Sequence, residues 1–328
     1  MFPRKLTSAV EQKSGLKSGE NGFKIQFEIS DTGYGKDHVK ILHVRREGNI
    51  HHIKEFEVNT HLKLYSKKDY LNGDNSDIVA TDSQKNTVYL LAKKFGIKSP
   101  EDFALTLTKH FLMKYRHVKE AHVHVQEYPW ERIKYNGPDN RAAQHNHAFV
   151  FTPIATRYCD IIHQRDMRPT VISGLKELRV LKTTRSSFVD FVDDEYRSLP
   201  DMEDRLFSTS VSCAWEYLTV DDIDFDQTWS TIKDIILKNF AGDPIDGVPS
   251  PSVQNTIYLS QRDILAAVSQ IAVVNIEMPN IHYYPFDMSK FPKVIQGENK
   301  EVFHPVDKPN GNIFSQLARV DVALKSKL

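Results

Sequence analysis

Two pairs of histidines are the first residues in this sequence whose spacing could support chemistry. One residue separates His122 from His124, and one residue separates His145 from His147. Residues spaced in this way share a face of a β-strand, so each pair could chelate a metal ion. No cysteine lies near either pair and nothing local supplies a third ligand. A structural or surface role is therefore favoured over a metal site.

The sequence lacks the short motifs that mark common nucleotide, hydrolase and zinc-protease sites. It has no G-x-G-x-x-G or G-x-x-x-x-G-K-[ST] phosphate loop, no G-x-S-x-G elbow and no H-E-x-x-H pair. An enzyme with this sequence must build its site from scattered residues, or must work without a cofactor.

The C-terminus carries the most specific short signal in the chain. Its last three residues are Ser326, Lys327 and Leu328. A C-terminal S-K-L is an address that the peroxisomal import receptor reads, and it is not a membrane anchor. We therefore expect a peroxisomal protein. Because peroxisomal reactions release hydrogen peroxide, an oxidase becomes a candidate.

Composition excludes several other classes of protein. The chain has 328 residues, of which 40% are hydrophobic, and its 43 basic residues balance its 43 acidic ones. A neutral chain has no general attraction to nucleic acid or to an anionic membrane. Cys159 and Cys213 are too few for a disulfide framework, and no apolar run reaches the ~18 residues of a membrane-spanning helix. Neither nucleic acid nor a membrane is an expected partner.

The elements that must position any site can be read from hydrophobic periodicity. The first half is predicted to hold strands over 23–29, 39–44 and 50–64, two helices, a strand over 121–126, and a further pair of strands over 148–151 and 158–163. Thr81 or Asp82 is expected to cap the first helix, which ends at Gly96. Ser99 is expected to cap the second helix, with Pro100 in its first turn.

The second half repeats this order of elements. Strands are predicted over 178–182, 207–217 and 271–284, and helices over 229–240 and 257–269. Each half thus reads as strand, strand, helix, helix, strand, strand, which predicts an α+β fold of antiparallel sheets with paired helices on one face. We expect a flexible tail over 1–21, one repeat over 22–173, a second over 174–321, and a C-terminal tail over 322–328.

Several separated segments resemble the hallmark segments of the urate oxidase (uricase) family. They are Tyr34–Asp37, Val79–Ser83 with Lys85–Thr87, Leu181–Thr184 with Ser187 and Phe188, Asp204 with Arg205, Ser252–Gln254, Met278–Tyr283 and Ser326–Leu328. The resemblance runs from about Phe23 to Leu328. It implies the tandem T-fold, also called the tunnelling fold. It also implies a homotetramer that encloses a tunnel and has its active sites at subunit interfaces.

The resemblance further implies which residues bind urate, a flat purine anion. Phe188 would stack on the purine, and the planar guanidinium of Arg205 would meet its edge with two donors. The amide of Gln254 would supply one donor and one acceptor. The backbone N–H of Val253 would make a further contact.

The resemblance implies a proton relay as well. Lys36, Thr81 and His282 would form a hydrogen-bonded chain that takes a proton from urate or from water. Thr81 and the backbone N–H of Asp82 would also contact urate, and Asn280 would face the position of oxygen or water above the ring. In the family, Lys36, Thr81 and Asp82 come from one subunit and most of the other site residues from its neighbour.

Each of these residues has an ordinary structural alternative. Phe188 could be part of the core, and Arg205 could form an ion pair with Asp201, Glu203 or Asp204. Thr81 could be a helix cap, Lys36 a loop charge and His282 a structural histidine.

We therefore expect an enzyme that uses no cofactor and no metal and converts urate, oxygen and water to 5-hydroxyisourate and hydrogen peroxide. This reaction is the first step from urate toward allantoin. Two alternatives stay open. One is a metal-dependent pterin-type T-fold enzyme that uses the histidine pairs, and the other is a catalytically inactive matrix protein that binds purines.

Overall fold

The computed structural model describes residues 29–136 and 142–320. The expected tail over 1–21, the predicted strand over 23–29 apart from Ile29, and the signal at 326–328 lie outside the described residues.

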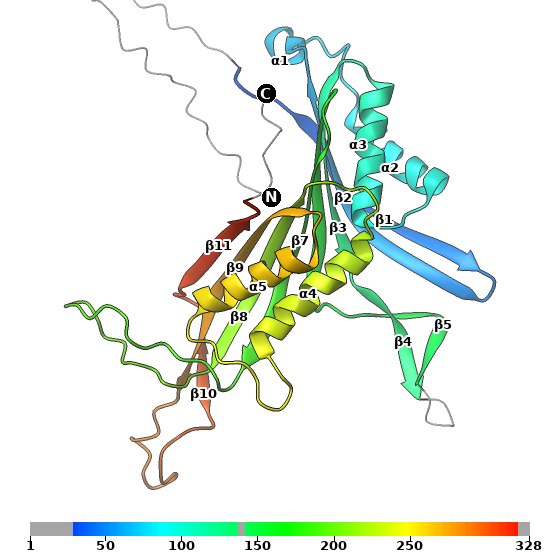
Figure 1. The fold of residues 1–328 in the computed structure, drawn as a ribbon. Coiled ribbons are helices and arrows are strands. Elements are labelled where there is room, and N and C mark those ends of the chain that lie inside the picture. The colour runs from blue at the N-terminus through cyan, green and yellow to red at the C-terminus, as the bar shows by residue number, and fades with distance from the viewer. Residues whose placement is uncertain (1–28, 137–141, 321–328) are drawn as a thin grey trace, which may run out of the picture.

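One antiparallel sheet runs through both halves of the chain (Figure 1). Its nine strands are β1 (Tyr34–Glu47), β2 (Ile50–Leu64), β3 (Val118–Tyr128), β6 (Thr156–Gln164), β7 (Thr170–Lys182), β8 (Phe207–Tyr217), β9 (Ile271–Pro285), β10 (Phe303–Val306) and β11 (Asn312–Ala318). They are hydrogen-bonded in that order up to β10, and β11 pairs with the earlier part of β9.

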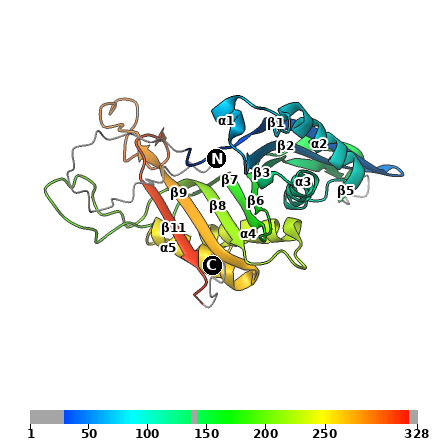
Figure 2. The ribbon, with the colours of Figure 1, turned by 90° about the horizontal axis from the view of Figure 1, so that it is seen from above.

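Two pairs of helices cover one face of this sheet (Figures 1 and 2). The first pair is α2 (Thr81–Phe95) and α3 (Pro100–Lys114), and the second is α4 (Phe225–Ala241) and α5 (Val253–Ala267). The short α1 (Lys68–Asn72) precedes the first pair. Each half therefore has the predicted order of two strands, two long helices and further strands, while α1, β10 and β11 are elements that the periodicity does not predict. The α+β prediction is confirmed.

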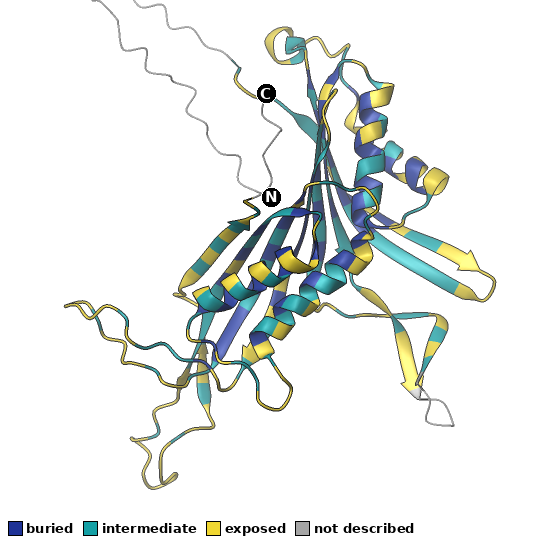
Figure 3. Cartoon of the chain, viewed as in Figure 1, coloured by how far each residue is buried: buried dark blue, intermediate teal, exposed yellow. Residues whose placement is uncertain are grey.

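The core lies between the sheet and the four long helices (Figure 3). Alternate residues of β2, including Phe56, Val58 and Leu62, are fully buried on this side. They meet the apolar face of α3, where Leu107 and Phe111 are fully buried as the helical spacing predicts. The other face of the sheet carries the more polar residues of the strands.

The capping prediction is confirmed for α3 and wrong for α2. The Ser99 hydroxyl accepts a hydrogen bond from the Asp102 N–H at 3.0 Å, and Pro100 opens the helix. By contrast, α2 begins at Thr81 itself, follows Ala80 and has no side-chain cap. Asp82 cannot serve as the cap because it lies inside the first turn.

Helix α5 begins four residues before its predicted start at residue 257. The helix begins at Val253 because the hydroxyl of Ser252 accepts from the Asn255 N–H at 3.1 Å and caps it. Serine directly before a helix is a preferred cap, so this start signal was present in the sequence.

The predicted pairing of strands 148–151 and 158–163 is wrong. Instead, β5 (Ala142–Phe151) pairs with β4 (Trp130–Asn136) in a two-stranded arm that projects from the sheet (Figure 1). The arm closes where the Thr152 N–H donates to the Pro129 carbonyl at 2.9 Å. Since β6 is occupied on both sides by β3 and β7, it has no free edge for β5.

A buried charge cluster joins the two halves. Arg157 of β6 donates to Glu101 of α3 at 2.8 Å and to Asp226 of α4 at 2.5 Å. The Ser173 hydroxyl of β7 donates to the other oxygen of Glu101 at 2.6 Å. The expected boundary near Gly174 lies within β7, directly beside this cluster.

No helix in the described ranges has the length and apolarity needed to cross a membrane.

Candidate active site

Phe188 and Arg205 lie together on the long connection between β7 and β8. The guanidinium carbon of Arg205 is 5.3 Å from the centre of the Phe188 ring. Phe191 stacks on Phe188 with ring centres 4.6 Å apart. The backbone holds this arrangement, because the Arg205 N–H donates to the Ser186 carbonyl at 2.8 Å and Phe188 exchanges two hydrogen bonds with Met202. Phe188 is only half-buried and lies outside the hydrophobic core.

Arg205 is a partly buried cation that has no anionic partner in residues 29–136 and 142–320. Its Nε is buried and makes no hydrogen bond, and burial lowers the pKa of its guanidinium. The acidic neighbours are engaged elsewhere: Asp201 pairs with Arg197 at 2.9 Å, and Asp204 accepts from the Thr184 hydroxyl at 2.6 Å. The alternative of a structural ion pair for Arg205 is therefore wrong within the described residues. A desolvated guanidinium of this kind favours an anionic ligand.

The first turn of α5 begins beside the same connection. The Ser187 N–H donates to the Ser250 carbonyl at 3.1 Å, and the Ser250 N–H donates to the Arg185 carbonyl at 2.8 Å. Val253 and Gln254 then form the start of the helix, with Val253 buried and Gln254 exposed. Backbone N–H groups in a first turn have no partner within the helix, so they are available to a ligand.

His282 and Asn280 enter the same region from β9. Burial lowers the pKa of His282, and the positive charge of Arg205 lowers it further, so the imidazole is neutral near pH 7. The ring stacks on Tyr284 with centres 5.7 Å apart. Asn280 is fixed by its backbone N–H, which donates to the Gly311 carbonyl at 2.8 Å.

The remaining predicted residues form a second group, where β1 meets α2. The Tyr34 hydroxyl accepts from the Val79 N–H at 2.9 Å, which joins the two segments. Lys36 lies close to Asp82: Lys85 lowers the pKa of the Asp82 carboxyl most strongly, and the charge of Lys36 adds to this effect.

Gln84 is a positioning residue of this second group that the sequence analysis missed. Its fully buried side chain accepts from the Thr60 hydroxyl at 3.0 Å and donates to the Val79 carbonyl at 3.1 Å. These bonds hold the first turn of α2, with Thr81 and Asp82, against β2. A single glutamine in a polar helical stretch gives no signal of burial, because only the tertiary contacts enclose it.

The two groups lie toward opposite edges of the sheet in one chain, one at β1 and α2 and the other at β9 and α5 (Figure 2). Five strands, β2, β3, β6, β7 and β8, separate β1 from β9. Six inter-strand spacings of about 4.8 Å amount to about 29 Å along the sheet. A single chain therefore brings Phe188, Arg205, Val253, Gln254, Asn280 and His282 into one region and Lys36, Thr81 and Asp82 into another.

The histidine pairs do not assemble a metal centre. His122 Nε2 and His124 Nδ1 lie 2.9 and 3.1 Å from the same oxygen of Asp160, and the rings of His145 and His147 pack edge to face on the arm. Across residues 29–136 and 142–320, no group of three or more His, Cys, Asp or Glu side chains is arranged to hold a metal ion.

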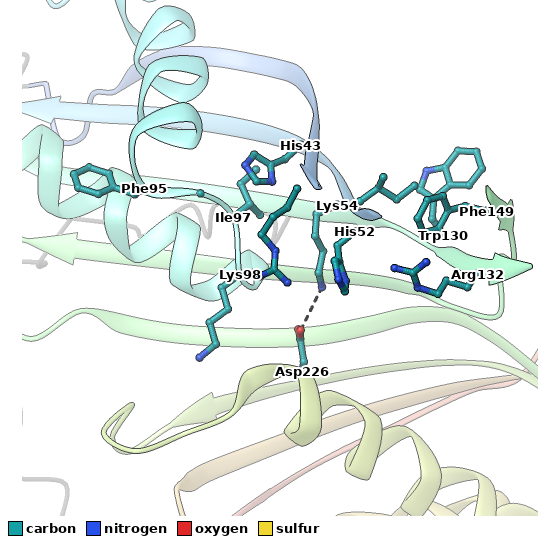
Figure 4. A pocket seen from close by; sticks show the side chains of 13 residues that line it. His43, His52, Lys54, Phe95, Ile97, Lys98, Trp130, Arg132, Phe149 and Asp226 are labelled. Carbon is teal, nitrogen blue, oxygen red and sulfur yellow. Dashed lines mark hydrogen bonds and ion pairs between the residues drawn. The ribbon is translucent and has the colours of Figure 1, made fainter. Parts of the chain in front are cut away.

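Two hollows in the surface of the protein differ in their distance from the candidate site residues. One of about 560 Å³ lies between the β1–β2 hairpin, the arm and α4, and contains none of the predicted site residues (Figure 4). Its Lys54 is paired with Asp226 at 3.3 Å and with Glu127 at 2.7 Å. An open hollow of about 380 Å³ is lined by Ser186, Ser187 and Asp204, the sequence neighbours of Phe188 and Arg205. The second hollow borders the candidate site.

The chain matches known uricases along most of its length. The family model for uricase matches residues 32–162 and 171–314. The uricase of Drosophila subobscura is 59% identical over 333 residues, covering 96% of this chain and 98% of that protein. The uricase of Oryctolagus cuniculus is 46% identical over 292 residues, covering 89% and 95%. The crystal structure of uricase from Arthrobacter globiformis superposes with a TM-score of 0.82 at 30% identity, covering 91% of this chain and 97% of that one. On its fold, its candidate site and these matches, the chain belongs to the uricase family.

Proposed function

We propose that this chain catalyses the oxidation of urate by O2 and water to 5-hydroxyisourate and hydrogen peroxide, the first step of urate degradation toward allantoin. The observation that carries the proposal is the guanidinium of Arg205, which has no acidic partner among the described residues and lies over the Phe188 ring beside the first turn of α5. A flat anion can stack on Phe188 and bind the guanidinium with two hydrogen bonds.

The two helix starts suit the same ligand. The N-terminus of a helix carries a partial positive charge and free N–H groups, so it favours an anion. Val253 and Gln254 begin α5, and Thr81 and Asp82 begin α2. Together they would offer donors to opposite edges of the purine.

The proton that urate or water gives up would pass along a chain of Lys36, Thr81 and His282. The neutral imidazole of His282 can accept a proton, and a hydroxyl such as that of Thr81 can accept from one neighbour while it donates to the other. Electrons pass from the urate anion to O2, which leaves as hydrogen peroxide, and water adds to the oxidised purine. Asn280 is the residue proposed to face the oxygen or water, and no cofactor or metal takes part.

A complete site requires a second copy of the chain. Since β1 and β9 lie far apart in one subunit, we propose that β1 and α2 of one subunit face β9 and α5 of its neighbour in a homotetramer that encloses a tunnel. The sheet offers edges for this purpose, because β1 and β11 each pair with only one strand within the described part of the chain. Free sheet edges are natural sites of pairing between copies.

We further propose that the import receptor reads Ser326, Lys327 and Leu328 and carries the enzyme to the peroxisome. A product as reactive as hydrogen peroxide suits that compartment.

The test is to follow the ultraviolet absorbance of urate and the uptake of O2 with purified protein and a metal chelator. Decay of the urate band, with one O2 consumed per urate, is the expected result. Stable absorbance with bound urate would favour the inactive purine-binding protein, and activity lost to the chelator and restored by metal would favour the metal-dependent enzyme.

The relay is tested with Lys36→Met. We expect kcat to fall by about 10²- to 10⁴-fold, the usual contribution of a general acid or base, while KM changes little. Lys93→Met, an exposed lysine of α2, is the matched control. An equal loss of urate binding in Lys36→Met would remove Lys36 from the relay.

A further inference from the structure

A β-bulge displaces the backbone of β1 directly after Lys36. The ladder between β1 and β2 is regular up to Lys36 and resumes at Val39. Between these points, Asp37 and His38 together face Asn59 of β2. His38 has a φ of 58°, in the left-handed region that few residues other than glycine adopt. Bulges occur next to active sites because they re-aim side chains.

Side chains of β2 hold this bulge in place. His61 Nε2 lies 2.9 Å from the carboxylate of Asp37. The side-chain oxygen of Asn59 accepts from the backbone N–H of His38 at 2.8 Å, and Glu57 contacts the His38 ring at 2.6 Å. Both bulged residues are therefore bonded to the neighbouring strand.

His61 also contacts the residue on the other side of Lys36. A Cβ added to Gly35 would lie 2.2 Å from the Cδ2 atom of His61 and 1.8 Å from the Thr60 carbonyl oxygen. The backbone at Gly35 thus passes so close to the His61 ring that only glycine fits. His61 touches both neighbours of Lys36 in the sequence.

The geometry excludes direct action of His61 on the substrate side of Lys36. Successive residues of a strand point to opposite faces, so Gly35 and Asp37 share the face of His61 while Lys36 points to the other. That other face is the one covered by α2, where the charge of Lys36 reaches Asp82. Side chains on opposite faces do not touch, so any control that His61 has over the position of Lys36 passes through the backbone.

We infer that His61 is a positioning residue, which fixes the backbone on both sides of Lys36 through Asp37 and Gly35 and so aims the lysine at the active site. This inference rests on the proposed function, in which Lys36 moves protons. A partly exposed contact between a histidine and a carboxylate contributes little to stability. A small displacement of a catalytic group is costly by comparison, since misplacement by about 1 Å can lower a rate by about 10²-fold.

The experiment compares His61→Leu, His61→Gln and wild type in steady-state urate oxidation. His61→Leu keeps the bulk of the ring but removes the donor, and we expect kcat to fall by about 10- to 100-fold with KM nearly unchanged. His61→Gln should recover most of kcat, because its amide can donate to Asp37. His52→Leu is the matched control. His52 lies on β2, as His61 does, and its contact with Glu47 of β1 is 3.4 Å long and remote from Lys36.

A second variant keeps the test valid if His61→Leu fails to fold. Asp37 is 45% exposed, so Asp37→Ala removes the same contact with little risk to the core. It should lower kcat as His61→Leu does, and the double variant should be no slower than either single one. Additive losses in the double variant, or wild-type kcat in Asp37→Ala, would overturn the inference.

The outcomes separate this inference from the proposed function. If wild type does not oxidise urate, or if Lys36→Met retains its kcat, the proposed role of Lys36 fails and the inference fails with it. If Lys36→Met is slow while His61→Leu and Asp37→Ala turn over like wild type, only the role of His61 is wrong.

Discussion

At the scale of single residues, the candidate site depends on an arginine, Arg205, whose positive charge is not paired with any acidic side chain among the described residues. Arg205 lies against the Phe188 ring, and its Nε is buried without a hydrogen bond. Leaving a polar group in this state costs free energy. A ligand that brings two acceptors to the guanidinium regains that free energy on binding, so the unliganded chain is prepared for an anion.

Arg205→Lys tests this interpretation. Lysine keeps the charge but not the planar pair of donors, so we expect KM for urate to rise by about 10- to 100-fold, as for the loss of one charged hydrogen bond. Steady-state kinetics measures the change. Arg262→Lys, an exposed arginine paired with Asp263 on the surface of α5, should leave KM within about twofold; an unchanged KM in Arg205→Lys would contradict the proposed contact.

The titration of His282 provides a second prediction for single residues. Burial and the charge of Arg205 both lower the pKa of His282 below its usual value of 6.5. Removing a nearby positive charge favours the protonated imidazole. Arg205→Met should therefore raise the pKa of His282, although burial still keeps it below 6.5, while Arg205→Lys should leave it in place.

NMR of histidine-labelled protein measures this pKa, with His282→Gln to assign the resonance. The activity of wild type should fall only below pH 6.5, where His282 takes up its proton. Identical titration of His282 in all three proteins would show that Arg205 does not act on it.

At the scale of elements, the first turns of helices supply free backbone N–H groups, whatever side chains those residues carry. α5 begins where Ser252 caps it, and that cap fixes the orientation of Val253 and Gln254. α3 begins in the same way with Ser99, but lies remote from the candidate site. Both cap hydroxyls accept a hydrogen bond from a backbone N–H, and Ser99 also donates to the Asp102 carboxylate at 2.7 Å.

This pair of caps allows a controlled experiment. Ser252→Ala and Ser99→Ala should each lower the free energy of unfolding by at least about 1 kcal/mol through loss of the cap hydrogen bond, and Ser99→Ala by somewhat more because its bond to Asp102 is lost too. Only Ser252→Ala should also raise KM for urate, since only α5 presents Val253 and Gln254. Urea unfolding and steady-state kinetics measure the two effects, and equal KM values in both variants would separate the cap of α5 from the site.

At the scale of the whole molecule, one chain holds the two groups of candidate site residues far apart. The continuous sheet separates β1 from β9, so a local movement cannot bring the two groups together. The Arg157 cluster joins the helices of both halves, so we expect the two halves to unfold together.

Mixed oligomers test whether a site takes its halves from two chains. Lys36→Met and Arg205→Met should each be almost inactive alone. Assembled together at random, they should regain up to about a quarter of wild-type activity, since about one site in four joins two intact halves. Co-expression with two affinity tags isolates the mixed oligomers, and no recovery in them would place both halves in one chain.

The Arg157 cluster provides a prediction on stability. Arg157→Met leaves the carboxylate of the fully buried Glu101 without its positive partner, at a cost of about 3–5 kcal/mol. Urea unfolding should show one transition at a lower midpoint, and adding Glu101→Gln should restore part of the loss. The exposed Arg46 supplies the control: Arg46→Met should change stability by no more than about 0.5 kcal/mol, and two separate transitions in wild type would mean that the halves unfold independently.

The sequence by itself determined the fold class and named the candidate site residues. Periodicity is a local property, so strands such as β8 and helices such as α3 follow from it directly. Their tandem order also follows, because each half repeats the same pattern. The candidate site residues follow from short segments that resemble the uricase family, and the residue types of a segment can be read directly from the sequence.

Only the tertiary structure decided which residues meet. The pairing of β5 with β4 depends on which sheet edges are free, and the burial of Gln84 depends on what packs around it. The contacts of His61 with Asp37 and Gly35 join residues far apart in the chain. Whether a described acidic side chain reaches Arg205 depends on the same packing. Local preferences do not specify such contacts, because they form only when the packed sheet and helices bring distant segments together.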